Sequence, residues 1–107
     1  MKFMLIKQGS IVHHDTDDYD YLVVSNEHYQ MYFKTIIAVP VSHDTRYQQA
    51  AYQESPLFIT IATDQGCVVG LLQYLVTLPV AECRLTNIPS LDEHQRQQIR
   101  NCIHSFF

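Results

Sequence analysis

Runs of apolar residues separated by short polar segments predict that the chain is built mainly from β-strands. One such run, Thr35–Val41, is almost wholly β-branched or apolar, as expected of a strand that is buried on both faces. Pro40 has no backbone N–H to donate to a sheet, so it places a bulge or an edge near the end of this strand. The run then delivers three reactive side chains together, those of Ser42, His43 and Asp44. A rigid strand with polar groups at its end is a common support for a site.

Further apolar runs predict the rest of a mostly antiparallel, strongly curved sheet or small barrel. A hairpin is expected where Ile11–His14 and Tyr19–Ser25 flank an aspartate-rich loop of about four residues. Gly70 interrupts a later apolar run and indicates a bulge or a close backbone approach. The polar segment 43–55 is predicted to be a long exposed loop, and loops of this length often carry function. Additional strands are expected at 56–62, within 67–78 and at 82–85.

Two segments carry helix signals. Asn26 is placed to cap a short helix over about 27–33, because its side chain can accept from an early backbone N–H. Near the C-terminus, Ser90 and Glu93 fit a capping box with Ser90 as the N-cap. Apolar residues then recur at the spacing of an amphipathic helix that lies on the sheet. These residues are Ile99, Cys102, Ile103 and Phe106.

Composition narrows the possible classes of protein. The chain has 107 residues, 47% of them hydrophobic, which fits a single domain over residues 1–107. Its formal net charge is −4 with only seven Lys and Arg residues, which disfavours non-specific nucleic-acid binding. No window is long enough to span a bilayer and no signal peptide is evident, so we expect a cytoplasmic protein. Cys67, Cys83 and Cys102 form no C-x-x-C pair and are expected to be small buried hydrophobes.

Five short segments, taken in order, carry a resemblance to a known family. They are GSIV at 9–12, YLVVS at 21–25, IAVPVS at 37–42, GCVV at 66–69 and RLTNIP at 84–89. In sequence and spacing they resemble motifs of the MazF/PemK family, the toxin endoribonucleases of type II toxin–antitoxin pairs. The resemblance runs from Gly9 to Phe107.

The resemblance implies a fold, partners and a reaction. Members have a small SH3-like barrel, are usually homodimers, and bind the C-terminal tail of an antitoxin. They cut single-stranded RNA without a metal or other cofactor. An acid–base pair helps the ribose 2′-hydroxyl attack its own phosphate, and a cation stabilises the charged phosphorane.

The chain departs from the family pattern at two of its polar positions. The family's Arg before the proline of its second strand is matched here by Tyr19 and Asp20. The family's Asp-Gln pair is matched by Leu72 and Gln73, so the carboxylate is lost and the amide is kept. Ser42 matches a Thr and keeps the hydroxyl. Nuclease chemistry is therefore either lost or rebuilt from other residues.

A rebuilt site would draw on histidines, because imidazole transfers protons near neutral pH. The candidate catalytic residues are Ser42, His13, His43 and Arg46, with Arg46 supplying a positive charge from the polar segment. The candidate substrate-binding residues are Tyr19, Gln73 and His14.

These candidates also have simpler interpretations. Neighbouring His13 and His14 face opposite sides of a strand, so at least one is expected to be merely solvated or packed. Ser42 can serve simply to end its strand. His13, His14, Asp15, His43 and Asp44 are metal-ligating types, but no local motif fixes their geometry, so we expect no metal.

Two classes of function follow. The first is a divergent toxin of a toxin–antitoxin system, a homodimer that binds an antitoxin and single-stranded RNA. The second is a catalytically silent protein-interaction module of the same fold, which the acidic charge and the lost Arg favour. A third, gyrase binding in the manner of the related CcdB toxins, has no residue signature here.

Overall fold

The chain alternates strands with short helices and ends in one longer helix. The computed structural model describes residues 5–55, 57–63 and 66–106, apart from the side chains of residues 53, 105 and 106. The strands are β1 (Ile11–His14), β2 (Tyr19–Val23), β3 (Thr35–Ser42), β4 (Phe58–Thr63), β5 (Gly66–Leu71), β6 (Val76–Pro79) and β7 (Cys83–Leu85). The helices are α1 (Glu27–Phe33), α2 (Ala50–Gln53) and α3 (Glu93–Phe106), with 3-10 turns η1 (Thr45–Gln48) and η2 (Val80–Glu82).

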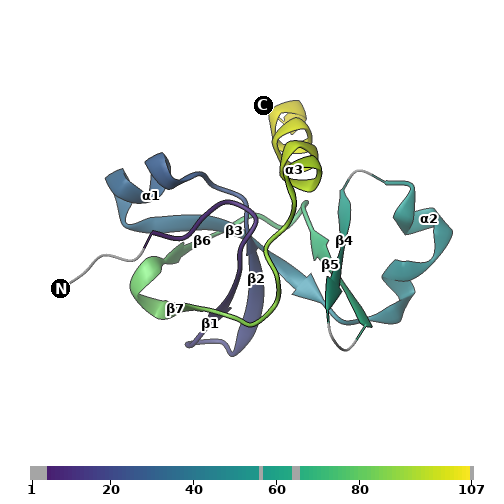
Figure 1. Ribbon diagram of the computed structural model, residues 1–107, viewed down its shortest axis with the longest axis horizontal. Coiled ribbons are helices and arrows are strands. Elements are labelled where there is room, and N and C mark those ends of the chain that lie inside the picture. Colours follow the sequence, from purple (N-terminus) through teal and green to yellow (C-terminus); the bar gives the residue numbers. More distant parts are fainter. Residues whose placement is uncertain (1–4, 56, 64–65, 107) are drawn as a thin grey trace.

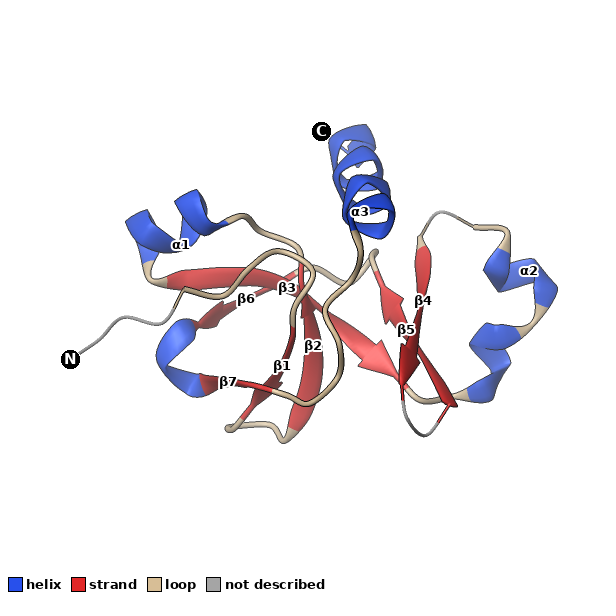
Figure 2. Ribbon diagram, in the orientation of Figure 1, coloured by secondary structure: helices blue, strands red, loops and turns tan. Residues whose placement is uncertain are grey.

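All the strand pairs are antiparallel, and the described strands form one sheet in the order β4-β5-β3-β2-β1-β7, with β6 also paired to β3. Figure 1 shows β4 and β5 on one side of the molecule and β1, β2, β6 and β7 on the other. The prediction of a mainly β fold with a curved antiparallel sheet and a C-terminal helix is confirmed (Figure 2).

Strand β3 joins the two halves of the sheet. Its first part pairs with β6 and β2, and Pro40, opposite Tyr21, is the last residue of the β2 ladder. The next residue, Val41, pairs with Gly70 of β5. Pro40 thus marks the point where the strand changes partners, and Ser42 lies just beyond it. This change of partners positions the end of β3 between the halves.

The core divides into two clusters because successive strand residues point to opposite faces. Ile11, Leu22 and Val39 lie in the first cluster, whereas Val12, Val23 and Ala38 lie in the second. Gly70 lies where an added Cβ would meet Leu22 Cδ2 at 3.0 Å, so the predicted close backbone approach is confirmed.

Helix α3 covers the first core cluster. Ile99 is fully buried and Cys102 is nearly so, as the helical spacing predicts, and Ile103 packs against the same cluster. The Gln95 Nε2 group also donates to the Thr60 carbonyl of β4 at 3.0 Å. The side chain of Phe106 lies outside the described part of the chain. The C-terminal helix is therefore packed on the sheet, above the junction of its halves (Figure 1).

The first residues of α1 and α3 show which of the two predicted N-caps is correct. Asn26 Oδ1 accepts from the Tyr29 N–H at 3.0 Å, so the cap of α1 is confirmed. The capping box at Ser90 is wrong, because Asp92 Oδ1 accepts from the Gln95 N–H at 2.8 Å and α3 starts after it. The physical reason is Leu91, which is buried in the core and donates its N–H to the Gly9 carbonyl.

The segment 43–55 is largely exposed, as predicted, but it is not a loop without regular structure. It contains η1 and α2, and Asp44 caps η1 by accepting from the Arg46 N–H. The rings of Tyr47, Tyr52 and Phe58 pack against one another at centroid distances of 5.2 to 5.6 Å. This aromatic cluster gives the segment apolar contacts that hold its two turns against β4.

Smaller departures concern β2 and the cysteines. The strand predicted over 19–25 ends at Val23. Cys83 and Cys102 are buried as expected, but Cys67 is exposed, because the start of β5 projects from the core. Within the described residues, none of the helices has the length and apolar character needed to cross a membrane.

Candidate functional site

Ser42 ends β3 in a half-buried position, and its side chain is used locally. Ser42 Oγ accepts from the Asp44 N–H at 3.1 Å, which turns the chain away from the sheet. Its hydroxyl therefore lies at the rim of the molecule and not inside the core. The strand thus carries Ser42 at its end, with His43 and Asp44 directly after it, as the sequence pattern predicts.

Arg46 is held by Asp44 on the outer side of this turn. Its Nε donates to Asp44 Oδ2 at 2.8 Å, and its guanidinium carbon lies 5.3 Å from the centre of the Tyr47 ring. The pKa of Asp44 is lowered, first by the Arg46 backbone N–H and then by the guanidinium. Both side chains are largely exposed, so the pair contributes little to stability. An incoming phosphate would have to compete with Asp44 for this cation.

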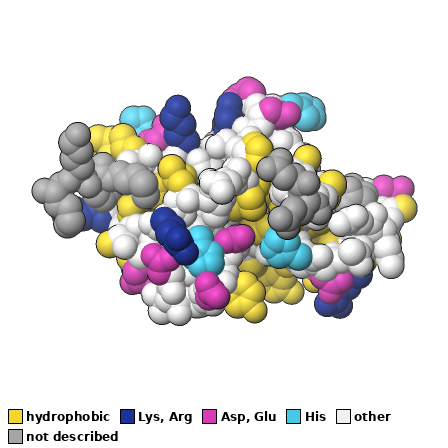
Figure 3. All heavy atoms as spheres, turned by 60° about the horizontal axis from the view of Figure 1, so that its bottom comes forward, with side chains coloured by type: hydrophobic (Ala, Val, Ile, Leu, Met, Phe, Trp, Pro, Cys, Tyr) yellow, Lys and Arg dark blue, Asp and Glu magenta, His cyan; other side chains and the backbone are white. Residues whose placement is uncertain are grey.

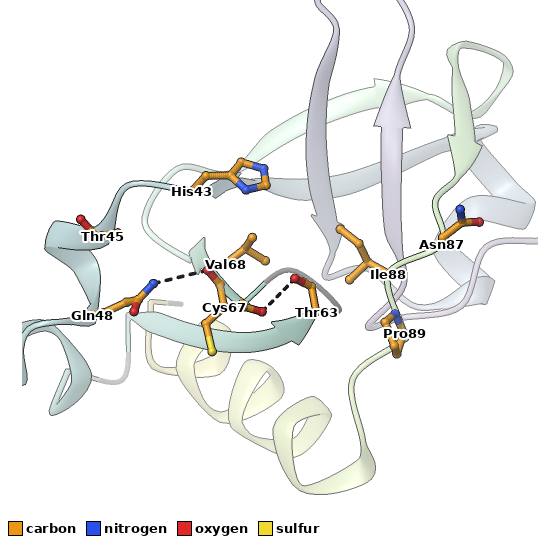
Figure 4. Close-up of a pocket in the computed structure, with 10 residues that line it drawn as sticks. His43, Thr45, Gln48, Thr63, Cys67, Val68, Asn87, Ile88 and Pro89 are labelled. Atoms are coloured by element: carbon orange, nitrogen blue, oxygen red, sulfur yellow. Dashed lines mark hydrogen bonds between the residues drawn. The ribbon is translucent and has the colours of Figure 1, made fainter.

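A cavity of about 530 Å³ opens beside this turn. It is bounded by the His43–Gln48 segment, the β4–β5 hairpin and the strand-to-helix segment 87–89 (Figure 4). Gln48 Nε2 donates to the Cys67 carbonyl at 3.4 Å, and Thr63 Oγ1 donates to the Gly66 carbonyl at 2.8 Å. The sulfur of Cys67 points away from the His43 ring (Figure 4). The lining consists of His43, Thr45, Gln48, Thr63, Gly66, Cys67, Val68, Asn87, Ile88 and Pro89.

The chemistry of the cavity is polar but almost uncharged. His43 supplies an imidazole, Cys67 supplies a thiol, and hydroxyl and amide groups supply the other polar side chains. No Lys, Arg, Asp or Glu is among the described residues that line it. Such a lining suits a ligand that exchanges neutral hydrogen bonds better than it suits a phosphate.

The histidines of β1 lie in a different environment from the cavity. His13 Nδ1 lies 2.9 Å from Asp20 Oδ1, and its Nε2 lies 2.8 Å from Asp18 Oδ1. His14 is buried, with Nε2 at 2.8 Å from Glu82 Oε1 and Nδ1 at 3.0 Å from Asp17 Oδ1. The second of these contacts is close but lacks the alignment of a hydrogen bond.

His14 is buried and its ring packs edge-on against Tyr21, which agrees with the simpler interpretation for one of the two histidines, but both rings also lie against carboxylates. The Asp-rich turn wraps both faces of the strand, so each ring finds carboxylates on its own side. The pKa of His13 is raised, chiefly by its hydrogen bond with Asp20. Burial lowers the pKa of His14, but its contacts with Glu82 and Asp17 outweigh burial and raise it.

The two remaining candidate residues also lie apart from the cavity. Tyr19 is exposed on β2, directly across the ladder from His14. Gln73 is exposed in the turn between β5 and β6. Among the candidate residues, all of which the structure describes, only His43 lines the cavity, with Ser42 and Arg46 next to it in the chain.

Sequence reasoning missed most of the cavity lining. Gln48, Thr63 and Asn87 come from three separated segments, and none forms a local motif. The available signal was weaker: polar residues placed just after or just before predicted strands. In the described part of the chain, no group of three or more His, Cys, Asp or Glu residues is arranged to hold a metal ion.

A second cavity, of about 540 Å³, lies between α1 and α3. Its lining is mainly apolar, with the Arg100 guanidinium as its cation. Arg100 Nη1 donates to Gln8 Oε1 at 3.0 Å, and Nη2 donates to Glu93 Oε1. The lining comprises Gln8, Val24, Ser25, Asn26, Tyr29, Ile37, Leu75, Arg100 and Ile103.

Comparison with known proteins identifies the fold. No protein-family model and no curated protein matches the sequence. Among solved structures, the chain is similar to a chain of the MazE–MazF complex (Form-I) from Deinococcus radiodurans, with a TM-score of 0.69 and 18% identity. It is also similar to MazF (Form-I) from the same organism, with a TM-score of 0.68 and 16% identity. Each match covers 96% of both chains. The protein therefore has the MazF fold over almost its whole length.

Proposed function

We propose that this chain is a MazF-like toxin of a cytoplasmic toxin–antitoxin pair and that it binds an antitoxin protein. The observation that carries the proposal is the match, over 96% of both chains, to structures in which MazF is combined with MazE. The ordered motifs of the sequence point to the same family independently of that match.

The cavity between α1 and α3 supports a protein partner. It is lined mainly by apolar side chains and carries Arg100 at its edge. A peptide segment with apolar side chains and a carboxylate complements such a surface, because burial of the apolar groups is combined with a charge-assisted hydrogen bond. This is the composition expected of an acidic antitoxin tail.

Growth and binding assays test the toxin proposal. Induction of the chain alone is expected to arrest growth, and co-expression of the product of the adjacent reading frame is expected to relieve the arrest. An Arg100→Gln variant tests the proposed binding surface. It should still arrest growth, but co-expression of the partner should relieve the arrest less well. Absence of arrest, together with absence of a complex between the two purified proteins, would contradict the proposal.

The second candidate function is metal-independent cleavage of single-stranded RNA. It is favoured by the neutral polar cavity at the end of β3, because unpaired bases are recognised by hydrogen bonding and stacking. His43 is the proposed proton-transfer group, Ser42 its hydroxyl neighbour and Arg46 the cation. His13, His14, Tyr19 and Gln73 are then proposed to contact RNA outside the cavity.

RNA incubated with the protein in EDTA separates these functions. Cleavage that is reduced at least about tenfold by His43→Gln is the expected result for a nuclease, given the usual contribution of acid–base catalysis. His94→Gln, on the exposed face of α3, is the matched control and should leave cleavage unchanged. Growth arrest without any RNA cleavage would contradict the nuclease proposal but would remain consistent with the protein-binding function.

We further propose that the chain forms a homodimer. Helix α1 exposes three consecutive large side chains, Met31, Tyr32 and Phe33, with exposed fractions of 62%, 82% and 62%. Contiguous apolar surface of this kind is typical of an interface.

A further inference from the structure

The β1–β2 hairpin carries an arrangement of charges that the proposed functions do not use. It consists of His13, His14 and the carboxylates of Asp17, Asp18, Asp20 and Glu82, named here the histidine clasp. Figure 3, in which the lower edge of Figure 1 comes forward, shows histidine, acidic and basic side chains gathered on one face.

The hydrogen-bonding groups of the clasp favour the protonated form of its histidines. A carboxylate can only accept hydrogen bonds, whereas a neutral imidazole donates from one nitrogen and accepts at the other. Both nitrogens of His13 lie within 2.9 Å of carboxylate oxygens, and both nitrogens of His14 lie within 3.0 Å of them. A neutral His13 ring would direct a lone pair at a negative oxygen, so the geometry of His13 favours imidazolium. At His14, Nε2 is aligned with Glu82, whereas Nδ1 lies 3.0 Å from Asp17 without that alignment, so the charged ring is favoured there by the proximity of two carboxylates.

The clasp links segments that are far apart in the sequence. His14 bridges Asp17 in the hairpin turn and Glu82, which immediately precedes β7. The backbone follows the same links, because the Asp18 N–H donates to the His14 carbonyl and the Asp15 N–H donates to the Glu82 carbonyl, each at 2.9 Å. Deprotonation of His14 would therefore weaken both the turn and the attachment of β7.

Other groups around the two rings keep their charge over the relevant pH range. Tyr21 Oη donates to Asp17 Oδ2 at 2.6 Å, and burial and this bond raise its pKa to about 12. Burial raises the pKa of Cys83, opposite His14 on β7, to about 11. Arg84, opposite His13, is paired with Asp15 at 2.9 Å, and Thr16 Oγ1 donates to Glu82. The histidines are thus the groups of the clasp that change charge near neutrality.

We propose that the histidine clasp is a pH-sensitive lock that holds the β1–β2 turn and β7 together while both imidazoles are protonated and releases them as the pH rises. The direction of this pH dependence follows from the linkage between proton binding and folding stability. A raised histidine pKa gives stability that is complete below the ordinary value of about 6.5 and is lost as the pH rises through the folded value.

At acidic pH, the dependence of stability on pH has the opposite sign. The pKa of Asp17 is lowered because hydrogen bonds from the Tyr21 hydroxyl and the Tyr19 N–H, together with the nearby His14 ring, outweigh its burial, and the pKa of Glu82 is lowered chiefly by His14. The stability from these carboxylates is present above their ordinary range of about 4 and is lost as the pH falls below it. The lock is therefore closed in the mildly acidic range and opens toward alkaline pH.

NMR on the full chain tests the lock directly. The rings of His13 and His14 are expected to titrate at higher pH than histidine in a short reference peptide. Between about pH 6 and about pH 9, amide protection, corrected for intrinsic exchange, should fall at Asp15 and Asp18. The Leu72 amide, which donates to the Leu57 carbonyl in the other half of the sheet, is the internal control and should not follow.

Two variants make the test specific. Glu82→Gln keeps a hydrogen-bonding side chain but removes the charge, so the pKa of His14 should fall and the loss of Asp15 protection should move to lower pH. Asp18→Asn should lower only the pKa of His13, and it should fold because Asp18 has a φ of 60°, which Asn adopts readily. Rings that titrate at or below the reference value would overturn the proposal, as would protection at Asp15 and Asp18 that changes in parallel with Leu72.

Discussion

At the residue scale, the structure shows how much depends on single side chains whose partners are distant in sequence. Gly70 is an example, because its lack of a Cβ lets β5 approach Leu22, a fully buried residue of β2. The sequence indicated a close approach at this glycine but not the residue that approaches. The physical constraint is one of volume in a packed core.

Gly70→Ala is expected to destabilise the protein by about 1–3 kcal/mol, the usual cost of overpacking. The added methyl carbon would lie 3.0 Å from Leu22 Cδ2. Chemical denaturation measures the loss. A second substitution, Leu22→Val, should make the cost of the alanine smaller, since it removes the contacted methyl group. If the two substitutions are simply additive, the contact is not the cause.

At the element scale, local signals and long-range packing contribute differently. The hairpin loop and the cap of α1 were predicted because each depends on residues within a few positions of one another. The start of α3 was misplaced because the buried Leu91 and its bond to Gly9 delay the helix. The cavity beside Ser42 was not predicted, because Gln48, Thr63 and Asn87 meet only through the fold.

The histidines illustrate the same division. The sequence placed His13 and His14 on opposite faces of one strand beside an Asp-rich turn, and the structure agrees. Their pairing with Asp17 and Asp18 depends on that nearby turn. The contact of His14 with Glu82 spans 68 positions and depends on the pairing of β1 with β7, for which no local pattern exists.

Helix α3 should depend on Ile99 for its attachment to the sheet. Ile99→Ala is expected to cost about 2–5 kcal/mol, because the side chain is fully buried in the first core cluster. The matched control is Asn101→Ala on the exposed side of the same helix, with a change within about 0.5 kcal/mol. Thermal unfolding of both variants makes the comparison. Equal losses would mean that the helix is held by its polar contacts instead.

At the scale of the whole molecule, the exposed face of α1 and the proposed dimer can be examined together. Tyr32→Glu places a charge at a position that is 82% exposed in the single chain, so the folded monomer should tolerate it. Desolvating that charge in an interface would be costly, so the dimer is expected to dissociate at least about tenfold more readily. Light scattering after size exclusion measures this change. If the variant dimer is as stable as the parent dimer, the interface lies elsewhere. If the parent chain is a monomer, the dimer proposal is contradicted.

The partner change of β3 at Val41 has a consequence for how the chain can be divided. One continuous strand supplies hydrogen bonds to β2 and β6 at one end and to β5 at the other, so both halves of the sheet depend on it. A fragment that lacks it keeps open sheet edges on either side, which favours aggregation over autonomous folding. A split of the protein for complementation should therefore leave β3 intact in one fragment.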